Sequence, residues 1–247
     1  MLSAHAAPPS VFIEELTWPE VRDAVAAKHG TALYYAGSTE QNGPHMATGK
    51  HNWIARDVTG RIARELGNAL AYPVMPFAPT GDASAKTAHM AYPGSVTVSE
   101  ATFGAVAREV AQSAASAGFK CIVLMGDHGG GQAALAGVAK SLTAAWKTRG
   151  IKVVHAREVY ERANDMAVAW LKEKGLPYGD HASIIDTSEL MFVMAAGVRM
   201  EQRAQAGPDN GSSGHAQLAT VALGEKFIGF KVQAAVEKIR SPAGCGR

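Results

Sequence analysis

Four short apolar runs constrain the fold of this chain more than any other feature. They are TALYYAG (31–37), LAYPVMPF (70–77), KCIVLMG (120–126) and IKVVHA (151–156), and each has the length and composition of a buried strand. A long segment with helical features follows each run. Strands that alternate with helices over short connections are typical of a parallel sheet.

The helices are expected between these runs. Residues 51–66 carry Ile54, Val58 and Ile62 at four-residue intervals, which places them on one face of a helix closed by Gly67. Further helices are predicted from Ser99 to about Gly118, over 131–150, after the fourth run as far as about Lys172, over 186–196 and over 223–240. The predicted fold is therefore a three-layer α/β fold with a mostly parallel central sheet and helices on both faces.

Length and patterning indicate one domain. The 247 residues contain no internal repeat and no linker, and the polar piece AGPDNGSSGH (206–215) is expected to be a surface loop because one helix follows it. We assign the domain to residues 11–247 and a disordered leader to residues 1–10.

The leader contains Ala4-His5-Ala6, the small-x-small pattern of signal-peptidase sites, which favours a periplasmic or secreted protein. The alternative is a cytoplasmic protein with an alanine-rich terminus.

Composition excludes several partners. A net charge of +2 with scattered basic residues gives no patch for nucleic acid, and no apolar run is long enough to cross a membrane. The hydrophobic fraction of 47% and the charged fraction of 19% are typical of a soluble globular protein. Cys121, in an apolar run, is interpreted as a small buried side chain, and a bond to Cys245 is left open.

Polar clusters lie at or near the expected carboxyl ends of strands, where open α/β sheets form their sites. Each cluster also has an ordinary structural interpretation. GDHGGGQ (126–132) lacks the Lys-Ser/Thr of a phosphate loop, and DTSEL (186–190) could simply begin a helix. Together, however, the clusters bring six metal-type or proton-transferring residues to loops beside buried elements: Glu40, His45, His51, His89, His128 and His181. This grouping favours a metal or catalytic site.

Four ordered motifs resemble those of the creatininase family of amidohydrolases. GSTEQNGPHMATGKH resembles that family's Gly-Ser-x-Glu-Gln-His-Gly-Pro-His signature, and GDHGGGQ resembles its Asn-Gly-His-Gly-Gly-Asn motif. HMAYPGSVTVS and DHASIIDTSEL resemble two further segments of the family. The resemblance runs from about residue 12 to residue 222 and implies the creatininase-like fold and a metal-dependent hydrolase.

The resemblance also implies a reduced metal site. The family holds two divalent metals, and this chain keeps its motif glutamate as Glu40 and its loop histidine as His128. His51 stands at the position of the bridging aspartate. Asn42 and Gly130 stand where the second metal takes its own ligands. We therefore expect one Zn²⁺ per chain, with Mn²⁺ as an alternative, held by Glu40, His51 and His128. The rival interpretation is a metal-free binding protein.

The remaining candidate residues follow from the same resemblance. His181 matches the acid/base histidine, Asp186 matches a family glutamate, and Asp127 is a candidate base or a partner that orients a histidine. The expected substrate-binding residues are Asn42, His45, His89 and Tyr92.

The expected reaction is hydrolysis of a carbonyl-centred C–N bond in a small molecule, most simply a cyclic amide, by a single metal-activated water. The alternatives are a hydrolase of a lactone or cyclic sugar-derived ketone, and an inactive periplasmic binding protein. The resemblance further implies a homo-oligomer, with a hexamer as one arrangement.

Overall fold

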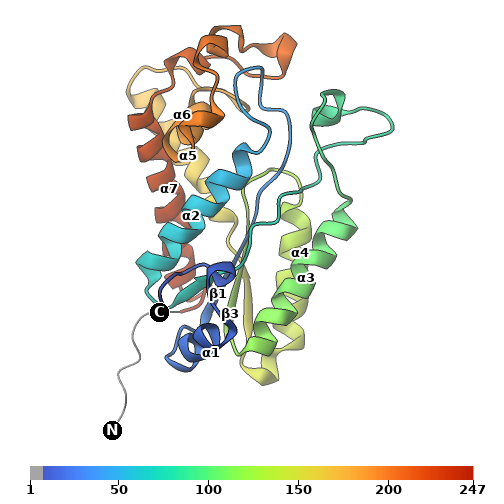
Figure 1. The fold of residues 1–247 in the computed structure, drawn as a ribbon, viewed down its shortest axis with the longest axis vertical. Coiled ribbons are helices and arrows are strands. Elements are labelled where there is room, and N and C mark those ends of the chain that lie inside the picture. Colours follow the sequence, from blue (N-terminus) through green and yellow to red (C-terminus); the bar gives the residue numbers. More distant parts are fainter. Residues whose placement is uncertain (1–7, 247) are drawn as a thin grey trace.

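A sheet of four parallel strands forms the centre of the computed structural model, which describes residues 8–246 (Figure 1). The strands are β1 (Thr31–Ala36), β2 (Ala69–Ala71), β3 (Cys121–Gly126) and β4 (Lys152–His155), in the order β2-β1-β3-β4. β1 and β3 pair along their whole length, from Thr31 opposite Cys121 to Ala36 opposite Gly126. Their carboxyl ends therefore lie side by side.

Helices cover both faces of this sheet, as predicted (Figure 1). One face packs against α2 (Lys50–Leu66) and α7 (Val221–Arg240), with α5 (Glu161–Glu173) and α6 (Ile184–Val193) packed on α7. The other face packs against α3 (Glu100–Ala117) and α4 (Gln132–Ala145), with α1 (Trp18–Ala26) at its edge. The α/β fold with a parallel central sheet is confirmed.

The central strands are apolar on both faces because both faces are covered. Successive side chains of a strand point to opposite faces, so Leu33 and Tyr35 of β1 lie in the core beneath α2 and α7. Tyr34 of β1 and Leu124 of β3 lie in the core beneath α3 and α4. This double burial explains why the strand runs show no alternation of apolar and polar residues.

Two predicted elements are shorter than expected. The run 70–77 forms a strand only over Ala69–Ala71, because Pro73 and Pro76 have no N–H to donate to a neighbouring strand. The predicted helix 131–150 ends at Ala145 and is followed by a 3-10 turn, Lys147–Arg149. The predicted cap of α3 is confirmed, since the Ser99 hydroxyl accepts a hydrogen bond from the amide of Thr102 at 3.0 Å.

The amino-terminal end of the described chain is tied to the edge strand. The amide of Ala71 donates to the carbonyl of Val11 at 2.7 Å. Seven residues of the predicted leader, 1–7, lie outside the described residues.

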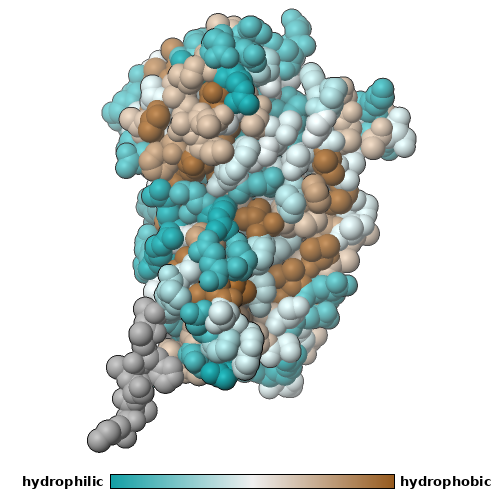
Figure 2. Space-filling model, in the orientation of Figure 1, coloured by the Kyte–Doolittle hydropathy of each residue, from teal (hydrophilic) through white to brown (hydrophobic). Residues whose placement is uncertain are grey.

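No helix in the described part of the chain is both long and apolar enough to span a bilayer. The visible face of the molecule mixes hydrophilic and hydrophobic residues (Figure 2).

A disulfide joins Cys121, the first residue of β3, to Cys245 in the tail after α7. The tail turns back at Ser241, whose carbonyl accepts from the amide of Gly244 at 2.9 Å. Cys121 is buried as interpreted, at 8% exposure, and the bond to Cys245 that the sequence leaves open is present. The bond holds the end of the chain against the amino end of the central strand.

We predict that Cys245→Ser lowers the free energy of unfolding by about 2–4 kcal/mol, because the lost bond closes a long loop in the unfolded chain. Denaturant unfolding of the wild type with and without dithiothreitol measures the same loss. The variant should not respond to dithiothreitol. A wild-type midpoint that is unchanged by reductant would contradict the prediction.

Candidate active site

The predicted site residues gather at the carboxyl ends of β1 and β3. In the sheet, β2 lies on one side of β1 and β3 lies on the other, so the strand order switches direction at β1. A crevice forms at such a switch in open α/β sheets. A cavity of about 570 Å³ opens there. The loop after β1 contributes Glu40 and Gln41, and the loop after β3 contributes Asp127 and His128. A 3-10 turn, Ala88–Ala91, contributes His89.

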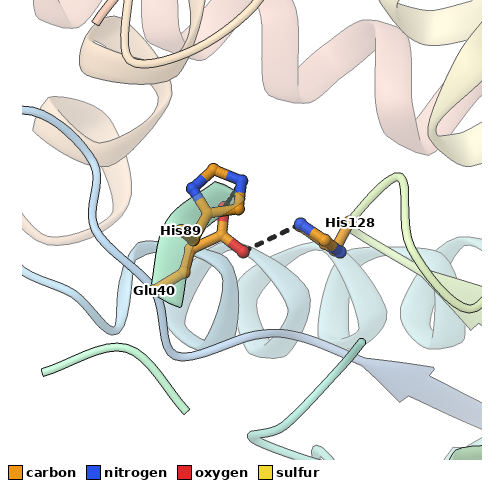
Figure 3. A group of neighbouring side chains, drawn as sticks. All are labelled: Glu40, His89 and His128. Atoms are coloured by element: carbon orange, nitrogen blue, oxygen red, sulfur yellow. Dashed lines mark ion pairs between the residues drawn. The ribbon is translucent and has the colours of Figure 1, made fainter. Parts of the chain in front are cut away.

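Three imidazoles converge on the fully buried carboxylate of Glu40. Its Oε2 lies 2.8 Å from Nε2 of His128, and its Oε1 lies 3.1 Å from Nε2 of His51 and 3.7 Å from Nε2 of His89. Figure 3 shows the Glu40 side chain between the rings of His89 and His128. These four side chains come from three loops and from the first turn of α2.

Charge pairing keeps Glu40 ionised despite its burial. Burial alone would raise the pKa of this carboxyl, but the contacts with His51 and His128 outweigh it and hold the pKa far below its usual range. The same competition acts on His51. Burial and Lys50 disfavour its charged form, whereas Glu40 and Asp127 favour it, and the net effect raises the pKa of His51.

The donor set around Glu40 fits a divalent metal. The ligand atoms of Glu40, His89 and His128 lie within 4.8 Å of one another, and one carboxylate with two imidazoles is a known zinc-binding combination. Two of the three predicted ligands, Glu40 and His128, therefore belong to this group. His89, expected in the substrate wall, joins them. The assignment of His51 as a ligand is not tested by these contacts and stays a prediction.

Asp127 supports His51 from behind. It is 1% exposed, and its Oδ2 lies 2.8 Å from Nδ1 of His51. Its Oδ1 accepts from the hydroxyl of Tyr35 at 2.9 Å and from Nζ of Lys231 at 2.8 Å. Burial would raise the pKa of Asp127, but Lys231 and His51 lower it below its usual range. Asp127 thus orients His51, whereas the ring of His128 accepts at Nδ1 from the amide of Gly130 at 2.9 Å.

Gln41 connects two histidines in the cavity wall. Its side-chain Oε1 accepts from the amide of Gly43 at 2.9 Å, which fixes the orientation of the amide group. Its Nε2 then lies 3.0 Å from Nδ1 of His89 and 3.1 Å from Nε2 of His181. Burial lowers the pKa of His181 to about 4, so its ring is neutral at pH 7.

Asp186 lies in the cavity wall in the first turn of α6. Its Oδ1 lies 2.6 Å from Nζ of Lys50, which is 1% exposed. Burial would raise the pKa of Asp186, but Lys50 outweighs it and lowers the pKa to about 2. The two residues form an ion pair beside His181.

Two predicted substrate-binding residues are not brought to the cavity. Asn42 is fully buried, and its amide donates to the backbone carbonyl of Glu40 at 2.9 Å. His45 is also fully buried, with Nε2 2.8 Å from the hydroxyl of Thr187, and burial lowers its pKa to about 4. Tyr92, in contrast, lines the cavity as expected.

Sequence reasoning missed several charged residues of the wall, among them Lys231 and Glu189. Lys231 interrupts the apolar face of α7 between Ile228 and Val232, and that interruption was a usable signal. Glu189 is 4% exposed and lies 3.5 Å from Nζ of Lys231. Burial raises the pKa of Glu189 to about 7. Lys231 lies outside every motif, whereas Glu189 lies in the DTSEL segment, where the resemblance singles out Asp186.

Comparison with known proteins gives consistent results. The family model for creatininase, described as creatinine amidohydrolase, matches residues 14–239. Creatinine amidohydrolase of Pseudomonas putida is 29% identical over 119 residues, a match that spans 48% of this chain and 45% of that protein. The chain thus matches less than half the length of this curated relative.

Solved creatininase structures share the fold. A mutant creatininase of the Zn-Zn type has a TM-score of 0.79 at 23% identity, covering 94% of this chain and 97% of the other. A structure described as creatininase Mn has a TM-score of 0.77 at 23% identity, covering 94% and 98%. The three-layer arrangement is therefore common to this chain and these enzymes.

We predict that Glu189→Gln becomes more stable relative to the wild type as pH rises. The pKa of Glu189 is raised on folding, so its ionisation destabilises the folded state progressively from the ordinary value of 4.5 up to about 7. Between pH 4.5 and 8 the difference in unfolding free energy should shift by up to about 3 kcal/mol in favour of the variant. Glu225→Gln, on the exposed side of α7, is the matched control. A difference in unfolding free energy between variant and wild type that does not change with pH would contradict the raised pKa of Glu189.

Proposed function

Because this chain belongs to the creatininase family, we propose that it is a metal-dependent hydrolase that cleaves a carbonyl-centred C–N bond in a small cyclic amide. The observation that carries the proposal is the convergence of imidazole nitrogens on the buried carboxylate of Glu40, in a cavity at the switch in strand order. The family match supports the reaction class. The cavity supports a small-molecule substrate.

The proposed metal centre holds one divalent ion through Glu40, His89 and His128. Zn²⁺ or Mn²⁺ suits this set, and related structures are described as Zn-Zn and Mn forms. When bound, the ion would act as a Lewis acid toward the substrate carbonyl and the attacking water. A single ion is supported because Asn42 hydrogen-bonds to the backbone and Gly130 has no side chain. His51 in place of His89 is the alternative set, because its Nε2 also contacts Glu40.

The proposed proton transfer uses His181. Its ring lines the cavity, takes a proton from the attacking water, and passes that proton to the leaving nitrogen. Gln41 keeps the His181 and His89 rings in place through its fixed amide group. Asp186, paired with Lys50, provides fixed charge beside His181. Asp127, already bonded to three side chains, orients His51 and does not serve as the base.

A second substrate class is favoured by the wall of the cavity. Hydroxyl, amide and charged groups dominate it, including Asn164, Ser212 and Ser213, and its phenol rings are Tyr92 and Tyr160. A hydroxylated lactone or cyclic sugar-derived ketone would find more hydrogen-bonding partners here than a flat apolar ring. Hydrolysis of a panel of cyclic amides, lactones and cyclic ketones separates the two classes.

Two further features belong to the proposal, the location of the protein and its oligomeric state. We place the protein in the periplasm or outside the cell, supported by the disulfide, which forms most readily in oxidising compartments. Fractionation of cells that express the native reading frame tests this location.

We also propose a homo-oligomer, to be tested by light scattering in solution. An inactive, metal-free binding protein is the alternative to all catalytic roles.

We predict one equivalent of metal per chain by elemental analysis. Glu40→Ala and His128→Ala should abolish metal binding, because they remove ligands common to both proposed sets. Asn42→Ala should keep the metal. His89→Ala should lose it if His89 is the third ligand, whereas loss in His51→Ala alone would select the alternative set. Two equivalents would disprove the single-ion centre, and none after reconstitution would favour the binding protein.

We predict that His181→Ala keeps one metal per chain while kcat falls by roughly 10²–10⁴ on the best substrate of the panel, the usual effect of losing a general acid or base. His29→Ala, at the opposite end of the sheet, is the matched control. Metal loss in the His181 variant would make His181 a ligand. Unchanged turnover would leave it a purely structural role.

A further inference from the structure

A continuous line of charged side chains connects α7 to the carboxylate of Glu40. Nζ of Lys231 lies 2.8 Å from Oδ1 of Asp127, and Oδ2 of Asp127 lies 2.8 Å from Nδ1 of His51. Nε2 of His51 then lies 3.1 Å from Oε1 of Glu40. Three regions far apart in the sequence, 40–51, Asp127 and Lys231, therefore meet through side chains of alternating charge type.

The line is buried throughout. Lys231 is 7% exposed, Asp127 1%, His51 5% and Glu40 0%. A buried ion is tolerated when its neighbours compensate its charge and satisfy its hydrogen bonds. Here each member is compensated in part by the next, so removal of one leaves the following member with fewer partners. Such a network has few alternative arrangements and holds its members in fixed positions.

Both ring nitrogens of His51 face carboxylates, Asp127 at Nδ1 and Glu40 at Nε2. His51 thereby occupies one oxygen of Glu40, whereas the other oxygen faces His128 at 2.8 Å. The ring of His51 thus limits rotation of the Glu40 carboxylate, together with the hydroxyl of Ser38, which donates to Oε2 at 2.8 Å.

We propose that Lys231, Asp127 and His51 form a positioning relay that fixes the Glu40 carboxylate for metal binding. The proposal rests on the metal centre proposed above. Lys231 acts through Asp127 and His51 and touches neither metal nor substrate. Partners one step behind the ligands, as His51 is here, typically contribute 10- to 100-fold to metal affinity.

The charged groups around Lys231 define what a substitution would disturb. Besides Asp127, Nζ of Lys231 faces Glu189 of α6 at 3.5 Å. Tyr35 of β1 donates to the same oxygen of Asp127 as Lys231 does. Lys231→Met therefore removes the cation and retains most of the side-chain volume, and Tyr35→Phe removes one neutral donor from the same carboxylate.

The experiment measures metal affinity by Co²⁺ titration against a competing chelator, together with the visible spectrum of the Co²⁺-loaded protein. Lys231→Met should weaken Co²⁺ binding by about 10- to 100-fold and alter the spectrum. Lys231→Arg should restore much of the affinity, because the guanidinium returns a cation to Asp127. Lys238→Met is the matched control, since Lys238 lies on the same helix but pairs with Glu158, and its affinity should match the wild type.

A double-mutant cycle distinguishes a relay from separate effects. If Lys231 acts through Asp127, adding Lys231→Met to Asp127→Asn should cause little further loss of affinity. Wild-type affinity and spectrum in a folded Lys231→Met would overturn the relay and leave the metal centre intact. If Lys231→Met fails to fold, Asp127→Asn provides the test, because it removes the charge between Lys231 and His51. Wild-type affinity and spectrum in a folded Asp127→Asn would overturn the relay. A wild type that binds no Co²⁺ would overturn the metal centre and the relay together.

Discussion

The burial of the Glu40 carboxylate is the constraint on which the rest of the site depends. A carboxylate without solvent must be surrounded by hydrogen-bond donors and positive charge, and the rings of His51 and His128 and the hydroxyl of Ser38 lie within hydrogen-bond distance of it. One of these, His51, requires a partner at its other nitrogen, which Asp127 supplies. Asp127 in turn requires a cation, which comes from α7 as Lys231. The identity of a residue near the carboxyl end of the chain is thus linked to that of Glu40 by charge balance.

The sheet explains how such distant residues meet. Two adjacent parallel strands, β1 and β3, end at the same level, so the loops that leave them face each other across the cavity. α2 begins beside these loops and presents His51 from its first turn. α6 and α7 close the other side of the cavity with Asp186, Glu189 and Lys231. Each wall comes from an element whose position is set by packing against the sheet, so the site is built on the most ordered part of the fold.

Much of this arrangement could be predicted from the sequence, and the exceptions have physical causes. The strands β1, β3 and β4 and their flanking helices follow from apolar runs and helical periodicity, which are local properties. The grouping of Glu40, His89 and His128 follows in part from motifs at strand ends. Sequence patterns do not assign Lys231 to the site and leave the Cys121–Cys245 bond open, because the partners in each pair lie more than a hundred residues apart in the chain. The buried states of Asn42 and His45 depend on how one loop folds over another, which no local pattern records.

The disulfide between Cys121 and Cys245 has a topological consequence for the carboxyl-terminal half of the molecule. Together with the backbone it makes residues 121–245 a closed covalent ring that contains β3, His128, His181 and Lys231. A single peptide-bond cleavage within this ring, for example by a protease acting on the loop 206–215, opens the ring without releasing either fragment. The cleaved protein would still carry α7 on the same covalent assembly as the central strand. Both fragments of a cleaved molecule would thus stay covalently linked, and together they would retain all residues of the site.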